Sequence, residues 1–147
     1  MSTCTFQRHV SLASPRWLHK ILCLHGGLSP EIKRLKDIHD LPREDNVDLQ
    51  EVFADLLWSS PNVNPKKQEW DFSPEGIGFA FPLVATKSFL KNNNINLLVR
   101  GHSFLENGIQ EFHEGKILSV FSTTDHCLRN NKTGGIVEVD HLGQVHK

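Results

Sequence analysis

The sequence ILCLHGGLSP, residues 21–30, decides the fold that this chain can adopt. Its first four residues form a short apolar run, and one histidine and two glycines follow directly. A short apolar run that ends at glycines is typical of a buried β-strand that opens into a loop. The pattern therefore predicts a strand at residues 21–24 and places His25 at the end of that strand.

A second strand of the same kind is predicted further along the chain. Ile95 to Val99 forms an apolar run, and Arg100-Gly101-His102 follows it. His25 and His102 thus each lie at a strand end, next to glycine. Proteins position metal ligands in this way, because rigid strands fix the imidazoles while the loops stay open. The alternative is that both histidines are loop or core residues bonded to backbone groups.

Three helices are predicted around these strands. One begins at Ser29-Pro30, because serine caps helices and proline suits the first turn, and it continues through Ile38. Another begins at Asp48, and its apolar residues recur at helical spacing. The third extends from Pro82 to Leu90 and ends at three asparagines. The apolar face of the second helix consists of Leu49, Val52, Phe53, Leu56 and Leu57.

The remaining segments complete a mixed α/β pattern. Ser59 to Phe79 is rich in proline, asparagine and glycine and is expected to form a long loop. Gly108 to Phe112 and Lys116 to Phe121 flank Glu114-Gly115, which indicates a hairpin, and a last strand is expected from Gly135 to Val139. Helices interleaved with strands predict an α/β fold, in which helices cover a mixed sheet on at least one face.

Composition and charge exclude several classes of partner. The 147 residues carry a formal net charge of -1, which gives no electrostatic reason for binding nucleic acid or an anionic membrane. No apolar run approaches the roughly 20 residues that cross a bilayer. The three cysteines have no CxxC spacing, which argues against a disulfide framework and a structural zinc site. A reducing compartment, the cytoplasm or the nucleus, fits these features.

The N-terminal residues have a composition of their own. Residues 1–30 contain Arg8, Arg16 and Lys20 but no acidic residue, as transit peptides do. The alternative is a short irregular leader over residues 1–20, which we prefer. Residues 21–147 then form one domain.

Four stretches, taken in order, resemble the phosphoprotein phosphatase family, which includes calcineurin and protein phosphatases 1 and 2A. The sequence LHGGLSP at residues 24–30 is followed by DLLWSSP at residues 55–61, by VRGH at residues 99–102 and by VFS at residues 120–122. The resemblance covers the chain from about Ile21 to its end, with spacing similar to that of the family. It implies a serine/threonine protein phosphatase that acts on phosphoproteins and binds regulatory proteins.

The resemblance also implies a fold and a metal site. The family builds a β-sandwich flanked by helices, and residues 21–147 match the C-terminal half of its catalytic domain. Two divalent ions, Mn, Fe or Zn, bind the substrate phosphate there and activate a water. By the same resemblance, His25 and His102 match two ligands of one ion, and Trp58 lines the nearby groove.

This sequence departs from the family at several positions. The family's GDxHG, GDxVDRG and GNHE motifs lie upstream of HGGLSP, and the 24 residues before His25 contain none of them. Glu75 stands where the family has an arginine that grips phosphate, and an anion there would repel phosphate. His126 stands at the position of an active-site tyrosine, and Ser60 replaces the aspartate of WSDP. We therefore expect a truncated chain that is inactive alone.

Two alternatives concern these altered residues. Glu75 could be a solvated loop carboxylate, because loops tolerate insertions and the alignment there could slip by a residue or two. Asp125, His126 and His102 could instead form a replacement metal site, although short polar runs after a strand are usually solvated loops.

Three interpretations of function follow from the match and the departures. The chain could be a fragment of an active phosphatase. It could be a non-catalytic phosphatase-like module that binds proteins, which the residues at Glu75, Ser60 and His126 favour. It could also have no stable role, because half a sandwich leaves apolar faces and strand edges open.

Overall fold

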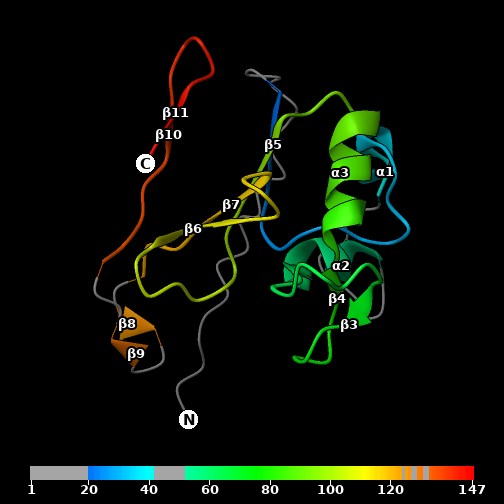
Figure 1. Ribbon diagram of the computed structural model, residues 1–147, viewed down its shortest axis with the longest axis horizontal. Coiled ribbons are helices and arrows are strands. Elements are labelled where there is room, and N and C mark those ends of the chain that lie inside the picture. Colours follow the sequence, from blue (N-terminus) through cyan, green and yellow to red (C-terminus); the bar gives the residue numbers. More distant parts are fainter. Residues whose placement is uncertain (1–19, 42–51, 124, 127–128, 131–132) are drawn as a thin grey trace.

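The computed structural model arranges a small mixed sheet, three helices and several short strand pairs (Figure 1). The described residues are 20–41, 52–123, 125–126, 129–130 and 133–147. Side chains are described for the same residues except those between 124 and 132.

The main sheet has four strands in the order β1-β5-β7-β6. β1, β5 and β7 run parallel, whereas β6 pairs antiparallel with β7. The predicted mixed sheet is thus confirmed. Its strands are β1 (Ile21–Leu24), β5 (Leu97–Arg100), β6 (Ile109–Phe112) and β7 (Ile117–Val120).

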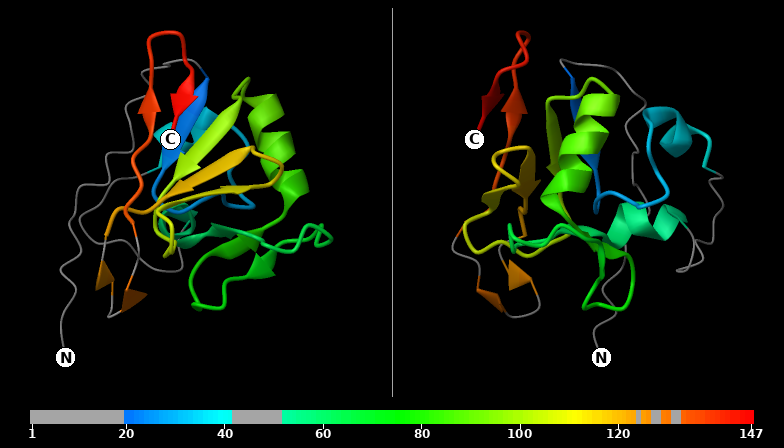
Figure 2. Two further views of the ribbon diagram at one scale, coloured as in Figure 1. Left: turned by 60° about the vertical axis from the view of Figure 1, so that its left-hand side comes forward. Right: turned by 45° about the vertical axis from the view of Figure 1, so that its right-hand side comes forward.

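Helix α3 (Leu83–Asn92) covers one face of this sheet, as Figure 2 shows. Its residues Phe89 and Leu90 belong to the same buried cluster as Leu98 of β5 and Ile117 of β7. The helix begins after Pro82, whose extended backbone forms the N-cap, and ends before Asn93. The prediction of a helix from Pro82 is confirmed, with its end two residues later than expected.

The hairpin between β6 and β7 is also confirmed. His113, Glu114 and Gly115 all have left-handed backbone conformations, with φ of 50°, 58° and 72°. Glycine adopts this region without a steric penalty, and the reversal therefore occurs where Glu114-Gly115 predicted it.

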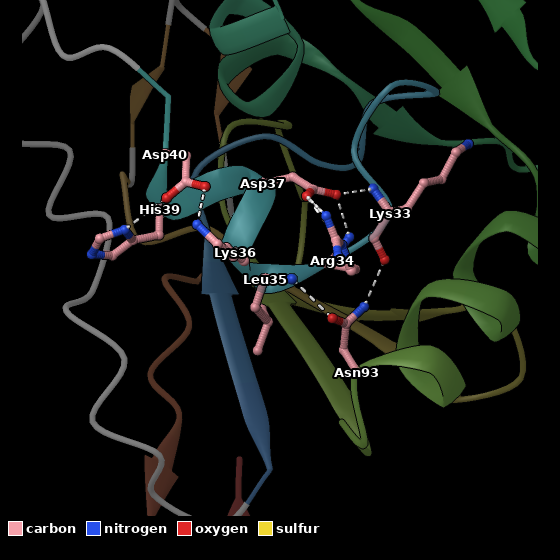
Figure 3. A network of polar contacts seen from close by, with 8 residues as sticks. All are labelled: Lys33, Arg34, Leu35, Lys36, Asp37, His39, Asp40 and Asn93. Atoms are coloured by element: carbon pink, nitrogen blue, oxygen red, sulfur yellow. Dashed lines mark hydrogen bonds and ion pairs between the residues drawn. The ribbon is translucent and has the colours of Figure 1, made fainter.

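The first predicted helix is partly wrong. Helix α1 (Leu35–His39) begins five residues after Pro30 and is short. The Ser29 hydroxyl donates to Asp55 Oδ2 at 2.7 Å and accepts a bond from Glu31 N, so it forms a local turn and a distant tie instead of a helix cap. Arg34 is the N-cap, and the Asp37 carboxylate accepts bonds from the backbone nitrogens of residues 33 and 34 (Figure 3).

The second predicted helix is confirmed over its C-terminal part. Helix α2 (Val52–Trp58) buries Ala54, Leu56 and Leu57. Asp48 and Leu49 lie outside the described residues.

The predicted long loop contains two short strands and ends where a third begins, which is a correction. β4 (Phe79–Phe81) pairs in parallel with β2 (Ser60–Pro61) and antiparallel with β3 (Asp71–Phe72). Only two residues of β2 and two of β3 pair, which is too short a segment for a period-2 pattern to be recognised.

The C-terminal part is built of short hairpins. β8 (Asp125–His126) pairs with β9 (Arg129–Asn130), and β10 (Glu138–Val139) pairs with β11 (Val145–His146). The strand expected from Gly135 is therefore confined to its last two residues. No helix in the described part of the chain is long and apolar enough to cross a bilayer.

Some apolar surface remains exposed. Val63, Phe72 and Ile136 keep 80% or more of their surface accessible to solvent. The described residues nevertheless form a buried cluster that joins β1, β5, β7, α1, α2 and α3. Apolar side chains are thus exposed at the surface, as expected, but the described residues also form a buried core.

His113 ties three segments together. Its Nε2 donates to the carbonyl oxygen of Asn62 at 3.1 Å, and its Nδ1 lies 2.8 Å from Thr86 Oγ1, an arrangement that suits the neutral ring. Burial lowers the pKa of His113, and this effect outweighs the Asn62 carbonyl and Glu114, which raise it. The turn after β6, the loop after β2 and helix α3 therefore meet at one imidazole.

We predict that acid weakens this tie. Because the pKa of His113 is lowered on folding, its contribution to stability is present above the unfolded pKa of 6.5 and is lost as the pH falls. His113→Asn should lower the free energy of unfolding by about 1–2 kcal/mol near neutral pH and flatten its dependence between about pH 7.5 and pH 5.5. Urea unfolding at several pH values measures both effects. The same substitution at exposed His141 should change neither, and an unaltered pH dependence in His113→Asn would contradict the assignment.

Candidate metal site

His25 and His102 meet at one edge of the main sheet. β1 and β5 are neighbouring parallel strands, and Leu24 pairs in register with Arg100, so both histidines leave the sheet at the same edge. Their ring centroids lie 5.3 Å apart with an interplanar angle of 64°. The backbone nitrogen of Gly101 also donates to the carbonyl oxygen of His25 at 3.0 Å. The sequence pattern placed each histidine at a strand end, and the fold brings these two strand ends together.

The glycines after His25 allow this loop to approach helix α2. The Gly26 nitrogen donates to the carbonyl oxygen of Leu56 at 2.8 Å. A Cβ atom on Gly26 would lie 2.4 Å from the carbonyl carbon of Leu57, closer than any real contact. Only glycine fits there, so the close packing of loop on helix explains the first glycine of the pattern.

Trp58 and a strained backbone fix the ring of His102. Trp58 is the last residue of α2, and its ring meets that of His102 edge-on at 5.0 Å and 76°. His102 has φ of 66°, a left-handed conformation that non-glycine residues adopt at an energetic cost. Backbone strain of this kind persists where the surrounding structure enforces it, and it is frequent at functional sites.

Both imidazoles are held neutral by their surroundings. Burial is the main cause of the lowered pKa of His25, and His102 and Arg100 lower it further. Burial and then Arg100 lower the pKa of His102, although Glu75 opposes them. Neutral imidazole is the form that binds metal ions, so the electrostatics of this edge suit a ligand role.

Arg100 is the buried cation of the site. Only 2% of its surface is exposed, and its guanidinium donates to the Gly26 carbonyl oxygen, to Ser103 Oγ at 2.8 Å and to Ser60 Oγ at 3.3 Å. Burial lowers its pKa to about 10, and Glu75 raises it. Its direct partners among the described residues are thus neutral oxygens. In the sequence, Arg100 is part of the VRGH stretch at a strand end, and its burial becomes visible only in the fold.

Glu75 lies beside His102. It belongs to the turn between β3 and β4, where Gly76 and Gly78 have φ of 79° and 70°. Its Oε2 is 3.4 Å from His102 Nε2, while 60% of the Glu75 side chain remains exposed. Glu75 is therefore both solvated and in contact with the histidine pair. The fold places this carboxylate at the edge where the resemblance expected a phosphate-binding arginine.

The described residues contain no complete metal-binding group. Two neutral imidazoles face the same edge, but no group of three histidine, cysteine or carboxylate side chains among the described residues could hold a metal ion. His126 lies in β8, and its side chain, like that of Asp125, is outside the described ones. The alternative site formed with His102 therefore stays a prediction.

Comparison with known proteins agrees with this geometry. A family described as calcineurin-like phosphoesterase matches residues 5–104, more than half of the chain. The chain belongs to the calcineurin-like phosphoesterase family. The family resemblance that the motifs predicted is thereby confirmed, and membership implies divalent metal ions as cofactors.

Two relatives are serine/threonine phosphatases. The serine/threonine-protein phosphatase 6 catalytic subunit of Drosophila melanogaster is 36% identical over 121 residues, which cover 82% of this chain and 39% of that protein. A solved protein serine/threonine phosphatase from Saccharomyces cerevisiae, with similarity to human phosphatase PP5, superimposes with a TM-score of 0.71 at 29% identity. That match covers 82% of this chain and 37% of the yeast chain. The chain thus spans about two fifths of the length of each relative.

We predict that a carboxylate at position 60 stabilises the fold. Ser60→Asp would restore the family's WSDP sequence and set an anion beside the buried guanidinium of Arg100, so a charged contact would replace a neutral hydroxyl contact. The free energy of unfolding should rise by about 1–2 kcal/mol. Urea unfolding at neutral pH measures it. Ser88→Asp, at an exposed serine of α3, should give no gain, and a less stable Ser60→Asp protein would contradict the prediction.

Proposed function

We propose that residues 21–147 form part of the catalytic domain of a metal-dependent serine/threonine protein phosphatase, the C-terminal half by comparison with the family. The reaction would be hydrolysis of phosphoserine and phosphothreonine in proteins. The paired imidazoles of His25 and His102, 5.3 Å apart at one sheet edge, carry the proposal. Phosphoproteins and regulatory proteins are the expected partners, in the cytoplasm or nucleus. Residues 1–20 would form a leader before the domain.

His25 and His102 would hold one metal ion in this function. Neutral nitrogen donors suit Mn, Fe and Zn, and burial keeps both rings neutral. A bound metal pair would supply a Lewis acid for the phosphate and an activated water. The chain's own contribution is to fix two donors, with the sheet register and Trp58 holding the rings in place.

We further propose that this chain has no phosphatase activity by itself. Two imidazoles do not neutralise two divalent ions, and hard metals require carboxylate oxygen as well. Glu75 adds an anion beside His102, and an anion at that point opposes the approach of a phosphate dianion. The described residues thus favour metal binding more than turnover.

A non-catalytic, phosphatase-like module that binds proteins is the second candidate. The contact of Glu75 with His102 favours it, because a carboxylate replaces a phosphate-binding cation at the site itself. Ser60 favours it as well, because it leaves buried Arg100 with hydroxyl partners instead of a carboxylate.

The first test is direct assay of the purified chain. We expect no release of phosphate from a phosphothreonine peptide or a small aryl phosphate, with Mn²⁺ added or without it. Mn²⁺-dependent turnover that disappears in His25→Ala would overturn the proposal of inactivity.

The second test distinguishes two causes of inactivity, the missing segments and the altered residues. The N-terminal half of an active relative is fused to this chain, and metal content and turnover are measured. The fusion should bind metal, because His25 and His102 then meet further ligands, but it should turn over slowly. Glu75→Arg should raise kcat roughly a hundredfold, since one charge-assisted phosphate contact replaces a repulsive one.

Two controls complete the fusion experiment. Glu106→Arg makes the same charge change at an exposed residue and should leave kcat unchanged. If the fusion binds metal and matches its parent enzyme with Glu75 in place, Glu75 does not oppose phosphate and the non-catalytic candidate loses its main support.

A further inference from the structure

A cleft lies between helix α3 and residues 28–33, at the end of the HGGLSP loop. Its volume is about 250 Å³. Six of its lining side chains are apolar, from Leu28 and Ile32 on one side to Val84, Ala85 and Phe89 of α3 on the other, with Trp70 between them. A volume of this size accommodates about two apolar side chains of a partner.

The walls of the cleft are fixed before anything binds. Asn93, at the end of α3, accepts a bond from the Leu35 nitrogen at 2.8 Å and donates to the Lys33 carbonyl oxygen at 3.0 Å (Figure 3). This amide fastens the segment before α1 to the helix. Trp70 is held by an edge contact with Phe79 and a tilted contact with Phe81, at 5.9 and 6.1 Å between ring centroids. A preorganised cleft avoids the ordering cost that a flexible surface would incur on binding.

The charge of the cleft is one-sided. Ser29, Ser88 and Asn92 supply neutral polar groups, Lys33 supplies a cation, and none of the described residues that line the cleft is a carboxylate. The side chain of Lys33 extends away from Asn93 (Figure 3). Its ammonium donates to the Pro30 carbonyl oxygen and has no carboxylate partner among the described residues. An apolar floor beside an ammonium that has no counter-ion favours an apolar segment with acidic flanks.

We propose that this cleft docks a short acidic segment of a partner protein, with one or two bulky apolar side chains seated between Ile32, Trp70 and Val84. Val84 is 44% exposed on the rim, so an incoming side chain can reach it. The acidic flank lies against Lys33. This binding surface is separate from the histidine pair and does not depend on whether the chain is catalytic.

The test uses fluorescence anisotropy with two fluorescein-labelled peptides and the full chain. Both peptides have a central Leu-Phe pair, which aspartates flank in one and lysines in the other. The acidic peptide should bind with a Kd of about 10–100 µM, and the basic one at least about tenfold more weakly. Equal affinities, or no binding of the acidic peptide at 1 mM, would overturn the proposal.

Variants locate the bound peptide. Ser88→Trp fills the cleft from an exposed position of α3 and should weaken binding at least about tenfold, and Lys33→Glu should weaken it about fivefold. Lys91 is also exposed on α3 but does not line the cleft, so Lys91→Trp and Lys91→Glu are the matched controls and should change Kd less than about twofold.

Stability measurements on the same variants exclude another occupant. If a segment of this chain occupies the cleft, Ser88→Trp displaces that segment and lowers the unfolding temperature. That result, or a peptide affinity that Ser88→Trp leaves unchanged, overturns the proposal. Weaker peptide binding by Ser88→Trp with an unchanged unfolding temperature supports it.

Discussion

The parallel pairing of β1 with β5 is the constraint on which the rest of the structure depends. It sets Leu24 opposite Arg100, and it therefore brings His25 and His102, which are 77 positions apart in the chain, to one edge. A parallel pair needs a crossover connection, and here the connection contains the short helices, the small sheet and α3. A shift of one residue in the register would turn Arg100 to the other face and separate the site from its buried cation.

Arg100 determines the electrostatics of that edge. A guanidinium that is 2% exposed keeps its charge, and it disfavours a second positive charge on the nearby imidazoles. The same cation requires partners for its N–H groups, which Ser60, Ser103 and the Gly26 carbonyl supply. Burial is the main reason that both histidines are neutral, and Arg100 adds to it while it also holds the HGGLSP loop through the Gly26 carbonyl.

The sequence predicted the elements with strong local signals and missed those that depend on distant contacts. β1, the hairpin and α3 follow from apolar runs, from Glu114-Gly115 and from Pro82. The late start of α1 could not be predicted, because the Ser29 hydroxyl binds Asp55, a residue 26 positions away. The histidine pair was predicted from its strand ends and from family resemblance, whereas the burial of Arg100 is a property of the assembled fold.

In the proposed function, Glu75 has opposite effects on metal binding and on phosphate binding, the two steps that a metallophosphatase must combine. A carboxylate beside His102 offsets part of the positive charge that metal ions and Arg100 bring to the edge, so it favours metal binding. The same charge opposes a phosphate dianion, which the family holds with a cation at this position. Since Glu75 is 60% exposed, solvent weakens both effects, but it does not change their signs. In the proposed function, a carboxylate at this position would therefore separate metal binding from turnover, which is the physical argument for the non-catalytic candidate.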